Sequence, residues 1–170
     1  ISRGSKVTIA ADAVAGALSN ARQLATSKSR DVEFRLIKMK DPSGLSSGEE
    51  IRAVQIFEVG EGGLKPASRL RSLPAGVIVG SATAMTSLAD NTIKKAGDTN
   101  IPGVGTSYEY FAFRFRPDGS INFGELPPPA NGYFLTLYED KFQPSGNTPP
   151  ANFATIKLEP ATGAFSVYRP

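Results

Sequence analysis

The chain has 170 residues, of which 40% are hydrophobic, and this size suits one globular domain. It contains neither Cys nor His, which excludes disulfides and cysteine catalysis and removes the commonest general base. The net charge of +3 is unevenly spread, because residues 1–40 hold eight Lys or Arg against three Asp or Glu, whereas the later residues hold 11 against 13. The N-terminal part is therefore basic and the remainder nearly neutral.

The first segment with a regular pattern is an Ala-rich stretch from Ser5 to Ser29. Apolar or small residues recur there at alternating intervals of four and three, which is typical of one face of an α-helix. These residues are Val7, Ala11, Val14, Leu18, Ala21 and Ala25. A helix of about 25 residues is about 37 Å long, roughly twice what a small β domain needs, so we expect only its C-terminal half to pack on a sheet. The residues expected to be buried are Leu18, Ala21, Leu24 and Ala25. Val7 and Ile9 should be exposed, as in a helix cut from a longer one.

The later segments with a regular pattern are typical of β-strands separated by Gly- and Pro-rich turns. Strands are predicted at 31–39, 51–59, 108–116, 121–123, 133–138, 153–158 and 165–168, and 77–79 is a short apolar run. Residues 81–96 fit either one or two helical turns or a loop, and no internal repeat or linker is evident. We therefore predict an α+β fold in one domain, 1–170, with a helical spine at 1–30 packed on antiparallel sheet in a β-rich head at 31–170.

The strand predicted at 108–116 alternates most strongly. Phe111, Phe113 and Phe115 fall on one face, and Arg114 and Arg116 fall on the other. Three alternating Phe side chains are typical of a core face, so we expect them to point toward the helix. The alternative is a stacking platform for nucleic-acid bases.

Three segments occur in a recognisable order. They are Ala17–Ala25, with an Ala-Arg pair before the first strand, Phe113–Ser120, a central strand and turn, and Ile156–Phe165, a closing hairpin. Together they resemble the type IV pilin-like minor pseudopilins, above all the H-type pseudopilins of type II secretion and their FimT relatives. Tyr133–Leu137 also resembles protein D of the Verru_Chthon cassette, a pilin-like family.

The resemblance implies a non-catalytic subunit that assembles into, or initiates, a periplasmic pseudopilus of a type II secretion or type IV pilus-like system. It also implies a prepilin leader, methylation and a hydrophobic helix upstream of Ile1, which would anchor a periplasmic domain at the inner membrane of a Gram-negative bacterium. The expected partners are other pseudopilin subunits. The helix-packing residues expected to serve assembly are Val7, Ala11, Val14, Leu18, Ala21, Leu24 and Ala25.

A DNA-uptake receptor is the first alternative function, since some FimT-like minor pilins are DNA receptors. Its candidate phosphate contacts are Arg114, Arg116 and Arg169, but a net charge of +3 is modest for such a role, and nucleic acid is not the expected partner. A β-rich enzyme is a more distant alternative, because no pair of carboxylates has a spacing that nominates acid–base catalysis.

No cofactor or metal is expected from the sequence. Asp90, Asn91, Asp98 and Asn100 could supply oxygen ligands for Ca²⁺. Asp and Asn are equally typical of turns, however, so these residues do not by themselves predict a calcium site.

Overall fold

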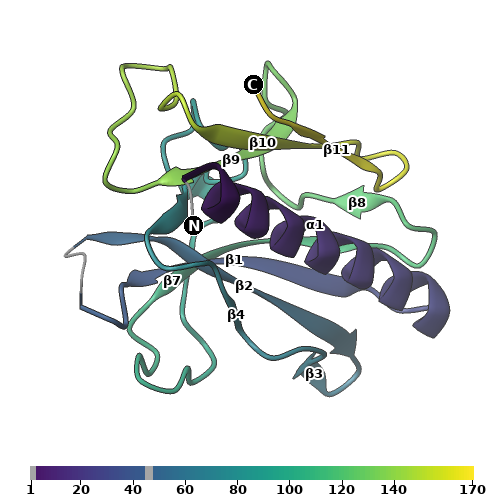
Figure 1. The fold of residues 1–170 in the computed structure, drawn as a ribbon. Helices are drawn as coiled ribbons and strands as arrows, with labels where there is room; N and C mark the ends of the chain where they lie inside the picture. Colours follow the sequence, from purple (N-terminus) through teal and green to yellow (C-terminus); the bar gives the residue numbers. More distant parts are fainter. Residues whose placement is uncertain (1–2, 45–47) are drawn as a thin grey trace.

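A computed structural model describes residues 3–44 and 48–170 and shows one helix packed on an antiparallel sheet (Figure 1). The elements in chain order are α1 (Arg3–Lys28), β1 (Val32–Lys40), β2 (Glu49–Gly60), β3 (Gly63–Pro66), β4 (Arg71–Ser72), β5 (Val77–Val79), the 3-10 helix η1 (Asn91–Ile93), β6 (Lys95–Ala96), β7 (Glu109–Phe115), β8 (Ile121–Asn122), β9 (Tyr133–Glu139), β10 (Phe153–Leu158) and β11 (Phe165–Tyr168). The strand order is β11-β10-β9-β5-β2-β1-β7-β6, with β3 and β4 also paired to β2 and β8 paired to β7. The predicted α+β arrangement is confirmed.

Helix α1 is docked along most of its length, not only at its C-terminal half. Val7 is 0% exposed, so the expectation that this residue faces solvent is wrong, whereas Ile9 is 49% exposed as expected. The reason is the length of the central strands, because β2 has 12 residues and strands rise about 3.3 Å per residue. That strand therefore extends about 40 Å, which matches the length of a 26-residue helix.

The helix contacts both halves of the sheet, β1 and β2 on one side and β9 and β10 on the other. Figure 1 shows α1 lying between these two groups of strands. The predicted direction of the Phe side chains is confirmed, because Phe111, Phe113 and Phe115 are buried in the same core cluster as α1. In the same core, Phe123 stacks on Tyr133 with ring centroids 3.9 Å apart, which joins the β8 segment to β9.

The predicted strands correspond to β1, β2 and β7 to β11, and both β10 and β11 have the predicted bounds. The short apolar run at 77–79 forms β5. Residues 81–96 form mostly a loop, with η1 as their single short helix. The short strands β3, β4 and β6 were not predicted, because two of them have two residues each and the third begins with Gly and ends with Pro. Among the described residues, no helix is both long enough and apolar enough to span a bilayer.

Candidate assembly surface

The apolar stripe of α1 packs on the chain's own sheet. Its members Val7, Ala11, Val14, Leu18, Ala21 and Ala25 are each at most 2% exposed. Leu24, the other helix-packing residue predicted from the sequence, is half-buried against the same core. These side chains are therefore covered within the domain, and the opposite side of α1 faces away from this core.

The outward side of α1 carries a second stripe with the same alternating spacing. We call it the outward stripe, and it consists of Ile9, Ala13, Gly16, Asn20 and Gln23. Each member lies two residues beyond a member of the buried stripe, and two residues correspond to about 200° around a helix. Ile9, Asn20 and Gln23 are exposed, and Ala13 and Gly16 are half-buried. The helical spacing places Gly16, Asn20 and Gln23 on the side opposite the buried stripe, but small and polar residues give no hydrophobic signal that would mark this side as a contact surface.

The three segments that carry the family resemblance meet at Arg22, near the end of α1. The Arg22 Nε donates a hydrogen bond to the Thr162 carbonyl at 2.9 Å, in the turn between β10 and β11. A Cβ at Gly119, in the turn after β7, would lie 3.1 Å from the Arg22 Nε. A Cβ at Gly163 would overlap the Gly119 carbonyl oxygen, so the close packing of these two turns requires glycine at position 163.

The opposite face of the sheet holds a buried ionic cluster that sequence reasoning missed. Arg35 is 1% exposed and lies between two rings, 4.3 Å from the Phe57 centroid and 4.0 Å from the Tyr110 centroid. It donates from Nε to Glu33 at 2.6 Å and from both terminal nitrogens to Asp98 at 2.6 and 3.0 Å. The Arg35 hydrogen bonds lower the pKa of Asp98, and burial raises the pKa of Tyr110 to about 12. The sequence indicates this cluster only through the alternation of Glu33 and Arg35 in a predicted strand.

The candidate DNA-contacting arginines are engaged in contacts within the chain. Arg114 donates to Glu33 at 3.1 Å, and Arg116 donates to the Ser120 hydroxyl at 3.1 Å. Arg169 donates to the Asn152 side chain at 3.3 Å. The first two belong to β7 and its following turn, whereas Arg169 follows β11 at the far end of the strand order. They are therefore split between distant strands of the sheet.

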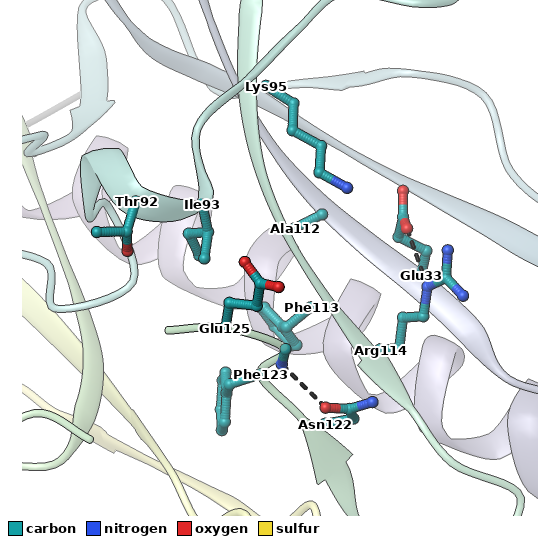
Figure 2. Close-up of a pocket in the computed structure, with 11 residues that line it drawn as sticks. Glu33, Thr92, Ile93, Lys95, Ala112, Phe113, Arg114, Asn122, Phe123 and Glu125 are labelled. Atoms are coloured by element: carbon teal, nitrogen blue, oxygen red, sulfur yellow. Dashed lines mark hydrogen bonds and ion pairs between the residues drawn. The ribbon is translucent and has the colours of Figure 1, made fainter. Parts of the chain in front are cut away.

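A pocket of about 400 Å³ lies at β7 and is lined by residues from both faces of this strand (Figure 2). Figure 2 shows Lys95 and Glu125 reaching toward its floor at Ala112 from different segments. Glu33 and Arg114 also line the pocket, but they are paired with each other. Carboxylates and amines are thus both present, without an arrangement among the described residues that nominates a nucleophile or a general base.

The carboxylates considered for Ca²⁺ have other partners. Asp90 accepts hydrogen bonds from the Thr92 N–H and hydroxyl, both at 2.8 Å, and thereby caps η1. These bonds lower the pKa of Asp90. Asp98 is held by Arg35. Among the described residues, no group of three or more His, Cys, Asp or Glu is placed to hold a metal ion.

No protein-family model matches this chain, and no curated protein matches its sequence. Solved structures match it over nearly its whole length. The minor pseudopilin EpsH from the type 2 secretion system of Vibrio cholerae is 9% identical, with 97% of this chain and 98% of that chain covered and a TM-score of 0.53. The type IV minor pilin FimU of Pseudomonas aeruginosa is 14% identical, with 98% and 93% covered and a TM-score of 0.54. The chain therefore has the pilin-like fold of minor pseudopilins and minor pilins, which confirms the resemblance at the level of the fold.

Proposed function

We propose that this chain is a non-catalytic minor subunit that assembles into, or initiates, a periplasmic pseudopilus of a type II secretion or type IV pilus-like system. The likeness to a minor pseudopilin of a type 2 secretion system and to a type IV minor pilin supports this proposal. In that role the domain would lie on the periplasmic side of the inner membrane, attached through a hydrophobic helix upstream of Ile1. Its partners would be other pilin-like subunits.

The observation that carries the proposal is the glycine at the centre of the outward stripe. Glycine inside a helix costs about 1 kcal/mol relative to alanine. At Gly16 an added Cβ would meet no atom within 4 Å, so the packing of the domain gives no reason for a glycine. A second helix that crosses α1 closely at this point would use the space that the missing side chain leaves.

Cross-linking tests this contact without changing the charge of the outward stripe. It is done in cells that express the complete secretion or pilus system. Because the chain has no Cys, Ile9→Cys introduces one thiol at an exposed position of the outward stripe. Treatment with a short maleimide–diazirine cross-linker, which needs a thiol on this chain alone, should join this variant to another pilin-like subunit on illumination. The matched control Glu61→Cys places an exposed thiol in the turn between β2 and β3, which lies beside Arg30 and so near the end of α1 opposite to Ile9, and it should give no such product. Equal cross-linking from both positions, or from neither, would contradict the proposed contact.

A second variant separates assembly from folding. Gly16→Leu should leave the free energy of unfolding unchanged or raised by up to about 1 kcal/mol, because leucine favours helix more than glycine does. The same variant should block assembly or secretion, since its side chain fills the crossing point. Gly16→Leu that folds and still supports full assembly would overturn the proposal.

A further inference from the structure

The free edge of the sheet at β11 carries two exposed large hydrophobic residues. Three large hydrophobic side chains of the described residues are exposed, and two of them, Val167 at 44% and Tyr168 at 60%, belong to this four-residue strand. Among the described strands, β11 pairs with β10 alone. An edge strand of this kind presents unpaired main-chain donors and acceptors to another chain.

The hairpin register identifies which main-chain groups of β11 are free. The Glu159 N–H donates to the Ala164 carbonyl at 2.8 Å, next to the turn. In an antiparallel pair, hydrogen-bonded positions recur at every second residue. The N–H and C=O groups of Phe165 and Val167 therefore point away from β10, toward the open edge.

A groove of about 390 Å³ lies beside this edge, on the side of β9, β10 and β11 away from α1. Its lining is mostly apolar and includes Met85, Phe134, Phe153 and Tyr168. Lys157 is the one charged residue among the described residues that line it. This lysine is exposed, and the ion pairs of the described residues do not include it.

The register predicts which side chains of an added strand would reach the groove. Phe134, Lys157 and Ser166 form one row across β9, β10 and β11. The end of the Lys157 side chain lies on the β9 side, with its Nζ 3.8 Å from where a Gly132 Cβ would be. Turned across the small Ser166, its flexible stem brings the amine toward a side chain opposite Ser166 on an added strand, for which a carboxylate is the complementary group. The position opposite Tyr168 suits an aromatic ring. These two positions are two residues apart. An added antiparallel strand would therefore carry, in chain order, an aromatic residue, any residue and an acidic residue.

We propose that the β11 edge is a docking site for an extended peptide segment of another protein, which adds antiparallel to β11 and carries an aromatic residue followed two positions later by Asp or Glu. The main-chain groups of Phe165 and Val167 hold its backbone, and Tyr168 and Lys157 select its side chains. This site lies on a different surface from the outward stripe of α1, so it stands apart from the assembly contact.

The test uses the 170-residue chain and a capped synthetic peptide, Gly-Ser-Thr-Tyr-Val-Glu-Thr-Ser-Gly, titrated while amide NMR shifts are followed. We expect saturable shifts in β10 and β11. Val167→Pro removes a donor that faces the open edge and keeps the bonds to β10, so it should weaken binding by about tenfold. The matched control Val167→Ala keeps the N–H and should bind nearly as well as the unchanged protein.

A charge exchange tests the side-chain selection independently of the backbone. Lys157→Glu should abolish binding of this peptide and restore it for the peptide in which Lys replaces Glu. The proposal is overturned if Val167→Pro binds as well as Val167→Ala, or if the unchanged protein binds both peptides equally. A dimer of this chain that Val167→Pro dissociates would assign the edge to a second copy and would likewise overturn the proposal.

Discussion

Truncation of Val7 tests whether the first turns of α1 are docked on the sheet. The Val7 side chain is 0% exposed and belongs to the main core cluster, so Val7→Ala removes two buried methyl groups. At about 0.8 kcal/mol for each buried group of that size, plus the cost of the cavity, the expected loss in the free energy of unfolding is about 2 kcal/mol. Ile9→Ala removes a larger part of a side chain that is 49% exposed, and its expected loss is below about 1 kcal/mol.

Thermal and urea unfolding, followed by circular dichroism, measure this difference. In a chain of this size, 1 kcal/mol corresponds to about 2–4 °C in Tm, so Val7→Ala should lower Tm by about 4–8 °C. Ile9→Ala should lower Tm by less than about 4 °C. Nearly equal effects of the two substitutions would refute the reasoning, because they would mean that the two sides of the helix are equally covered or equally free.

Three further outcomes follow from single contacts. Gly163→Ala should cost more than about 2 kcal/mol in denaturant unfolding, because its Cβ would overlap a main-chain oxygen, whereas Gly146→Ala, with a similar positive φ and open space around it, should cost about 1 kcal/mol. The Arg35 hydrogen bonds lower the pKa of Asp98, so their contribution to stability is present above about pH 4 and lost as the pH falls through the lowered pKa. Asp98→Asn should accordingly be less stable than the unchanged protein at neutral pH, and the gap should narrow in unfolding measured at more acidic pH. Double-stranded DNA should bind no better than weakly at about 0.15 M salt in a gel shift, whereas sub-micromolar, salt-sensitive binding that Arg114→Ala removes would favour the DNA receptor.

Alternation along the strands made much of the sheet predictable. Phe111, Phe113 and Phe115 share a face whatever the strand pairs with, and a face of three Phe side chains has to be covered. The extent of α1 docking was not predictable in the same way. Val7 belongs to the core that strands from both halves of the sheet form around α1, and the pattern of a single strand does not show which other strands meet at the helix.

The ionic cluster shows a different limit of sequence patterns. Arg35 occupies a strand position that alternates with core residues, and a charged residue there is typical of a solvent-facing side. Its burial arises from Phe57, Tyr110 and Asp98, which come from three other segments. Only the pair Glu33 and Arg35 is local in the sequence. The contacts of Arg35 with the three distant segments leave no periodic pattern, so alternation alone could not have revealed that this site is buried.

The two stripes of α1 explain why its sequence looks only weakly amphipathic. A helix with one buried face needs large apolar residues on that face and polar residues opposite. In α1 the buried stripe is built partly from alanine, which brings the helix axis close to the sheet, and the outward stripe is small and polar apart from Ile9. An outward stripe with one large apolar side chain is compatible with water, and the glycine at its centre would leave room for the proposed partner helix. The small difference in hydrophobicity between the two sides of α1 is therefore what we expect of a helix that packs on its own sheet on one side and, after assembly, on a neighbouring subunit on the other.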